Sequence, residues 1–273
     1  MLQRRPLDSR PSLAARLLVA LAIPALSAQA ATLAPPPGEH GVAVSVAECE
    51  LRYHVRRAPS GDERTVAIIA HGFMRNGTFM AGWAEAIAGA GITAVTVDLC
   101  ASSSGEGRRA DDGADLVALR RALGARDAIY VGVSAGGLSA LYAASLDAEG
   151  TRGVLLLDPV NAGGQARRAA GKVRAPVAAL VAKAQVCNAW RNIDGALETL
   201  ADATVVRVPH ASHCDFEWPS DRFCRVACLD THGGRDRERA EQRIRGLGVA
   251  FVRAVAEGQP DALPRWRGDI GPD

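Results

Sequence analysis

A glycine-flanked serine is the strongest chemical signal in this sequence. Residues 132–137 read Gly-Val-Ser-Ala-Gly-Gly and contain a G-x-S-x-G pattern centred on Ser134. The pattern directly follows the apolar run 128–133, and a sharp turn between a strand and a helix would expose the serine oxygen there. Glycine is needed because larger side chains would clash in so tight a turn. We interpret Ser134 as a nucleophile; a buried serine in an ordinary glycine-rich turn is the alternative.

A serine nucleophile needs a general base, and two histidines follow the last strand-like run, residues 204–208. His213 lies a few residues beyond that run, where a loop can carry a base to the serine, whereas His210 is expected to support it. His71 is a third candidate, but its position behind another apolar run suits the ordering of its own loop. We therefore predict that His213 is the base.

Asp158 is the predicted acid that would orient this histidine. It ends the apolar run 154–157, and a carboxylate buried there without a partner would be costly. Pairing with His213 removes that cost, while capping of a turn before the following proline is the alternative. In serine hydrolases with such a triad the acid more often follows the penultimate strand, which here is the run 177–181. The loop after that run has no carboxylate before Asp194.

An acyl-transfer site also needs backbone N–H groups that stabilise an oxyanion. Ala135 follows the serine directly, and Phe73 lies in the loop behind the strand-like run 65–70, so we predict these two N–H groups as the oxyanion hole. Nearby residues could line a substrate pocket or belong to the core. They are His71, Met74, Phe79, Met80 and Trp190.

Short apolar runs alternate with amphipathic stretches along most of the chain. Runs that suit strands are 65–70, 92–99, 128–133, 153–157, 177–181 and 204–208, after an opening hairpin of 42–46 and 51–56. Stretches that suit helices are 77–89, 110–123, 138–146, 194–200 and 240–256. This alternation predicts an α/β protein with a mainly parallel, doubly wound sheet, helices on both faces and no large cap. We expect residues 42–273 to form a single domain.

The N-terminus reads as a secretory signal peptide. Residues 1–30 combine a basic start, an apolar run at 17–26 and small residues before Ala30, and a proline-rich linker follows at 31–41. The apolar run is too short for a membrane anchor, so we expect a periplasmic or secreted protein with no membrane span after cleavage near Ala30. The net charge is +2, and removal of residues 1–30 leaves −1. With only 4% aromatic residues as well, a nucleic-acid partner is not expected.

The cysteines fit that compartment. There are six, all after the predicted cleavage site, and an even count outside the cytosol favours disulfides. They are Cys49, Cys100, Cys187, Cys214, Cys224 and Cys228. The pairing stays open, with the last four expected to tie the His213 loop to the neighbouring loop. A zinc site built from Cys214, Cys224, Cys228 and His232 is the alternative, although no metal is expected.

The order of these elements and residues resembles the α/β-hydrolase superfamily over the whole of residues 42–273. Within it the likeness is strongest to chlorophyllase-like and dienelactone-hydrolase-type serine esterases, through residues 71–73 (His-Gly-Phe), 132–137 and 157–160 (Leu-Asp-Pro-Val). In plant chlorophyllases an Asp-Pro-Val likewise supplies the acid, which supports Asp158. In those enzymes the segment around the serine resembles Gly-His-Ser-Arg-Gly-Gly, whereas this chain has Val133 and Ala135 in place of the His and the Arg. The resemblance therefore implies an esterase rather than an enzyme that acts on chlorophyll.

Together these features predict a secreted serine hydrolase of carboxylic esters that works through an acyl-enzyme. It would need no cofactor, and its substrate would be a small-molecule or lipid-like ester. An acyltransferase or peptidase on the same triad is one alternative, and added alcohol or amine would then accelerate turnover. A non-catalytic binding protein on a hydrolase scaffold is another, but the intact set of Ser134, Asp158 and His213 argues against it.

Overall fold

The protein is described by a computed structural model that covers residues 39–44, 50–59, 64–100, 109–231 and 233–259. All of these belong to the unit Ala34–Asp273. The predicted signal peptide, residues 1–30, and Cys49 lie outside the described residues. No helix in the described part is both long and apolar enough to cross a membrane.

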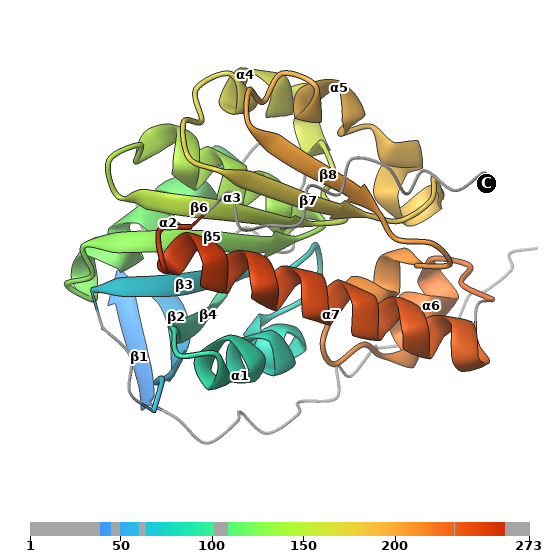
Figure 1. Ribbon diagram of the computed structural model, residues 1–273, viewed down its shortest axis with the longest axis horizontal. Coiled ribbons are helices and arrows are strands. Elements are labelled where there is room, and N and C mark those ends of the chain that lie inside the picture. Colours follow the sequence, from blue (N-terminus) through green and yellow to red (C-terminus); the bar gives the residue numbers. More distant parts are fainter. Residues whose placement is uncertain (1–38, 45–49, 60–63, 101–108, 232, 260–273) are drawn as a thin grey trace, which may run out of the picture. The chain divides into compact units, whose positions relative to one another are not determined.

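A sheet of eight strands forms the centre of the fold, in the order β1-β2-β4-β3-β5-β6-β7-β8 (Figure 1). The strands are β1 Glu39–Val44, β2 Glu50–Arg56, β3 Thr65–Ala70, β4 Thr93–Asp98, β5 Asp127–Val133, β6 Thr151–Leu157, β7 Val177–Val181 and β8 Ala203–Arg207. β2 pairs antiparallel with β1 and β4, and the other neighbours are parallel. The predicted sheet and its opening hairpin are confirmed, although β1 begins inside the segment expected to be linker.

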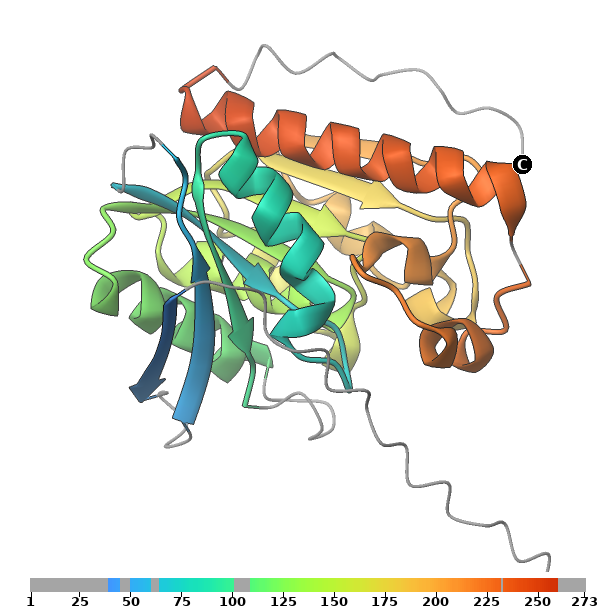
Figure 2. The ribbon, with the colours of Figure 1, turned by 90° about the horizontal axis from the view of Figure 1, so that it is seen from below.

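Helices cover both faces of this sheet (Figures 1 and 2). One face carries α1 Ala81–Gly89 and the long α7 Gly234–Ala256. The other carries α2 Arg109–Ala122, α3 Ala135–Leu146, α4 Ala166–Ala170 and α5 Asp194–Leu197. The remaining connections hold only the short helix α6 Arg222–Ala227 and the 3-10 turns η1 Gly77–Met80, η2 Ala162–Gly164, η3 Val186–Arg191 and η4 His213–Phe216. The described part therefore has no large cap.

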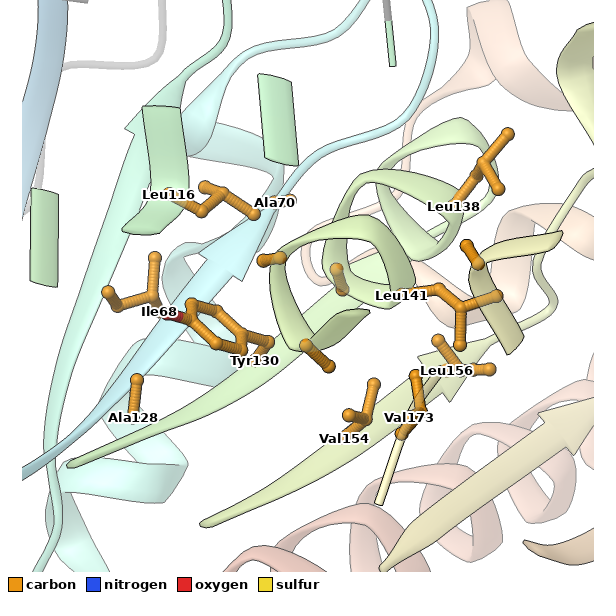
Figure 3. Packing of buried hydrophobic residues seen from close by; sticks show 14 of the residues in the cluster. Ile68, Ala70, Leu116, Ala128, Tyr130, Leu138, Leu141, Val154, Leu156 and Val173 are labelled. Atoms are coloured by element: carbon orange, nitrogen blue, oxygen red, sulfur yellow. The ribbon is translucent and has the colours of Figure 1, made fainter. Parts of the chain in front are cut away.

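The continuous apolar runs arise because the sheet is buried on both faces. Along β3, Ile68 and Ala70 join the core under α2 and α3, whereas Ala67 and Ile69 join the core under α1 and α7. Successive strand residues point to opposite faces, so both sets must be apolar. Figure 3 shows the first core, with Ile68 beside Tyr130 of β5.

The parallel strands place the predicted chemistry at one edge of the sheet. His71 follows β3, Ser134 follows β5, Asp158 follows β6, and His213 follows β8. Because parallel strands all end at the same edge, residues from four distant parts of the chain meet there.

Candidate active site

Ser134 lies on a strained turn between β5 and α3. Its backbone has φ 55° and ψ −122°, a sparsely populated conformation for a residue with a side chain. The turn is fixed by hydrogen bonds from Ser134 N to Leu157 O at 2.9 Å and from Gly137 N to Ser134 O at 3.0 Å. A Cβ on Gly132 would lie 2.1 Å from Gly136 O, so that position admits only glycine. The G-x-S-x-G pattern thus has the strand–turn–helix setting that its sequence predicts.

The structure brings His213 and Asp158 together. His213 Nδ1 and Asp158 Oδ2 are 2.6 Å apart, and both side chains are buried. Asp158 also accepts a hydrogen bond from Ala182 N at 2.9 Å, so the carboxylate has partners on two sides. His213 makes no hydrogen bond to Ser134 Oγ within the described residues. Such bonds often form only when substrate is bound.

Asn188, which sequence reasoning missed, completes the surroundings of Asp158. Its fully buried amide Nδ2 lies 3.3 Å from Asp158 Oδ2 and donates to Lys183 O at 2.8 Å. Its Oδ1 accepts from Gln185 N at 2.9 Å and from Arg191 N at 3.2 Å. One amide therefore shapes the loop after β7 and holds the carboxylate. Polar residues are common in loops, so nothing in the local sequence distinguishes Asn188.

The loop after β3 lies against the serine. A Cβ on Gly72 would be 3.3 Å from Ser134 Cβ, which shows how closely the two backbones approach. The N–H groups of Phe73 and Ala135 donate no hydrogen bond within the described part of the chain, and the latter opens α3, where the first N–H groups lack helical partners. Both groups are thus available to an acceptor.

His71 orders this loop, as the sequence suggested. Its Nε2 accepts from Leu99 N at 2.9 Å, and its Nδ1 donates to Gly72 O at 2.8 Å. Burial lowers the pKa of His71 to about 4, so the ring is neutral at pH 7. With both ring nitrogens committed to backbone groups, His71 neither serves as a base nor lines an open pocket.

Arg75 joins the loop after β3 to the segment that follows His213. Its guanidinium donates to both oxygens of Glu217, at 2.7 Å each, and to both oxygens of Asp221, at 3.0 and 2.7 Å. It also lies 4.1 Å above the Phe79 ring. Burial raises the pKa of Glu217, and the Arg75 charge acts in the opposite direction. The sequence gives no signal of this network, because its members are about 140 residues apart.

The predicted pocket residues separate into two groups. Met80 is fully buried and Phe79 nearly so, both within the core under α1, which agrees with the core alternative for these two residues. Trp190 is 72% exposed, Met74 59% and Phe73 49%. Phe79 and Met80 pack in the core between the sheet and the helices α1 and α7.

Two disulfides enclose the His213 loop. One joins Cys187 to Cys228 and the other joins Cys214 to Cys224, so η3, η4 and α6 are linked covalently. Cys100 is also disulfide-bonded. The sulfurs of Cys214, Cys224 and Cys228 lie within 4.8 Å of one another, but thiols consumed in disulfides supply no thiolate to a metal. The alternative of a zinc site at these cysteines is therefore wrong.

Known structures share this architecture. Esterase 2 of Thermogutta terrifontis is similar with a TM-score of 0.61 at 17% identity, over 82% of this chain and 96% of that one. The chain has the α/β-hydrolase fold. A monoacylglycerol lipase of Paleococcus ferrophilus (TM-score 0.58, 16% identity, 74% and 99% coverage) and Est1E of Butyrivibrio proteoclasticus (0.54, 13%, 76% and 97%) share it. No protein-family model and no curated protein sequence matches this chain. The likeness to chlorophyllase-like and dienelactone-hydrolase-type enzymes stays a prediction.

Proposed function

We propose that this protein is a serine hydrolase of carboxylic esters with Ser134, His213 and Asp158 as its triad. The observation that carries the proposal is the 2.6 Å contact between His213 Nδ1 and Asp158 Oδ2, at the sheet edge where Ser134 occupies a strained turn. A buried carboxylate bound to Nδ1 leaves Nε2 as the nitrogen that can accept a proton, which is what a general base requires.

In this mechanism Ser134 Oγ attacks the acyl carbon while His213 Nε2 takes its proton. Asp158 keeps the imidazole in the required tautomer and stabilises the imidazolium that forms. The N–H groups of Phe73 and Ala135 stabilise the oxyanion, and His213 returns the proton to the leaving alcohol. Water then attacks the acyl-enzyme while His213 Nε2 takes its proton. The bond between the acyl carbon and Ser134 Oγ breaks, the carboxylic acid leaves, and His213 returns the proton to Ser134 Oγ.

The protein is proposed to act in the periplasm or outside the cell, after cleavage of residues 1–30 near Ala30. The disulfides support this location, since such bonds persist mainly in oxidising compartments. Mass spectrometry of the protein recovered from outside the cytoplasm tests the cleavage. A recovered protein that retains residues 1–30 would contradict it.

The ester proposal is tested by hydrolysis of p-nitrophenyl esters from acetate to palmitate. Ser134→Ala should lower kcat/KM by about 10³-fold or more, because the covalent route is lost. Ser145→Ala is the matched control, since this half-buried serine lies near the far end of α3, where its Oγ donates to Tyr142 O at 2.8 Å. Absence of turnover with every ester would refute the proposal. A rate that rises with added alcohol would instead identify acyl transfer.

A further inference from the structure

Large apolar side chains are exposed around the candidate active site. Six of them, which we call the apolar rim, come from three separate segments: the loop after β3, η3, and α6 with the residues directly after it. They are Phe73, Met74, Trp190, Phe223, Val226 and Leu229. Val226 and Leu229 are 75% and 77% exposed, so these side chains reach well into solvent. Apolar side chains gathered in this way mark a surface that binds something.

The three segments are joined to one another. The disulfide Cys187–Cys228 brings η3 to the end of α6, with Cα atoms 5.3 Å apart. At the other end of α6, Arg75 bonds Asp221 and its guanidinium lies 5.8 Å from the Phe223 ring. The segments that carry the rim are therefore held next to one another. In Figures 1 and 2, α6 lies at the end of the sheet toward which the parallel strands point.

Helix α6 exposes apolar side chains, whereas an ordinary surface helix buries them. Among its six residues only Cys224 is buried, while Phe223 and Val226 face solvent. Such a helix gains little from burial, and it is held instead by two disulfides and by Asp221, which accepts from Cys224 N at 2.8 Å. The apolar face is kept outward by covalent bonds.

Backbone conformation and charge add to this picture. Trp190 and Leu229 have φ values of 55° and 53°, a region disfavoured for large side chains, and strain of this kind concentrates at functional surfaces. Lys183 and Arg222 lie in or beside the same segments, are exposed, and form no ion pair within the described residues. Exposed apolar side chains with cations such as Lys183 and Arg222 nearby suit a lipid surface, because the apolar groups enter the acyl chains and the cations contact anionic head groups.

We propose that the apolar rim docks the protein on an anionic, ester-bearing lipid surface, so that its substrates are acyl esters presented at an interface. This inference rests on the proposed ester hydrolysis. A second copy of the chain seated on the rim would cover the approach to Ser134, whereas a lipid surface would deliver substrate to it. Lipid esters in such a phase supply both the apolar chains and the scissile bond.

The test measures sedimentation with vesicles of phosphatidylcholine, with and without phosphatidylglycerol, using Ser134→Ala so that no lipid is consumed. In this background, the added double change Val226→Gln/Leu229→Asn should weaken partitioning roughly tenfold or more, because two apolar side chains no longer enter the lipid. Asparagine is chosen at position 229 because it tolerates the positive φ of this residue. A thiol assay that finds no free thiol verifies that the disulfides are intact in the variant. Leu146→Gln is the control, since Leu146 is 55% exposed at the end of α3 remote from Ser134. The Leu146→Gln control should partition like the Ser134→Ala parent. Phosphatidylglycerol should strengthen vesicle binding of both the parent and this control.

Equal partitioning of the rim variant and the control would overturn the inference, as would indifference to phosphatidylglycerol. A dimer that the rim variant abolishes would overturn it in favour of a second copy. Hydrolysis of soluble p-nitrophenyl acetate by the chain with Ser134 intact is measured separately. Vesicle binding without hydrolysis of any p-nitrophenyl ester from acetate to palmitate would refute the proposed function while leaving the rim as a lipid-docking surface.

Discussion

At the scale of single residues, the acid of the candidate triad depends on a neighbour that carries no charge. Asp158 is almost completely buried, and a carboxylate in that position needs hydrogen-bond donors to offset the loss of its water. Ala182 N supplies one, and Asn188 Nδ2 supplies another at 3.3 Å from Oδ2, the oxygen that also bonds His213. Asn188 is thus a positioning residue for the histidine, acting through the aspartate.

Replacement of this amide should affect turnover and folding together. We expect Asn188→Ala to lower kcat by roughly 10- to 100-fold, because a hydrogen bond to a charged group is lost, and to destabilise the fold by about 1–3 kcal/mol. Steady-state kinetics and thermal unfolding check the two effects. Asn192→Ala is the control, since Asn192 bonds Asn161 at an exposed site. A kcat equal to that of the control variant would show that Asn188 does not position Asp158.

At the scale of elements, the His213 loop is held by bonds that reach far along the chain. Cys214 follows the histidine and is bonded to Cys224 of α6, while Cys187 precedes Asn188 and is bonded to Cys228. Both side-chain partners of Asp158, the imidazole of His213 and the amide of Asn188, are therefore next in sequence to a disulfide-bonded cysteine. The sheet itself contains none of these four residues.

Reduction should consequently lower activity before it unfolds the sheet. With dithiothreitol, we expect hydrolysis of p-nitrophenyl butyrate to fall about tenfold or more while far-ultraviolet circular dichroism is retained, because the site loops lose their constraint. The variant Cys187→Ala/Cys228→Ala should show part of this loss without reductant. Unchanged turnover after thiol counting has confirmed full reduction would exclude the role.

The same contrast explains how far the sequence could predict the structure. Strands β3 to β7 follow from local apolar runs, because burial on both faces of the sheet requires consecutive apolar residues, whereas the edge strand β8 is less buried. Ser134 and Asp158 could be located because each ends such a run. Helix α6 could not, because six residues held by disulfides have no periodic pattern. Arg75 and Asn188 escaped for a related reason: their partners are set by tertiary contacts between segments that are distant in sequence.

At the scale of the whole molecule, His71 couples stability to pH. Burial lowers its pKa to about 4, whereas an unfolded chain has a histidine pKa of about 6.5. Between these values the unfolded chain binds a proton that the folded chain does not, so stability decreases as pH falls from about 6.5 to 4. Above pH 6.5 both states are neutral and this contribution is constant. Glu217, whose pKa burial raises, acts in the opposite direction in acid, so the two effects must be separated.

A histidine replacement separates them. In urea unfolding, the parent should lose about 1.4 kcal/mol per pH unit through His71 across that window, and His71→Gln should lack this part of the slope. The variant should be less stable at pH 7, because glutamine does not bridge Leu99 N and Gly72 O as the ring does. The difference in unfolding free energy between the variant and the parent should shrink toward pH 4, because the parent is destabilised there by protonation or displacement of the His71 ring. His210→Gln, at an exposed site, is the control and should follow the parent curve. Parallel curves for His71→Gln and the parent would mean that His71 binds its proton equally in the folded and the unfolded chain, which would contradict a pKa lowered by burial.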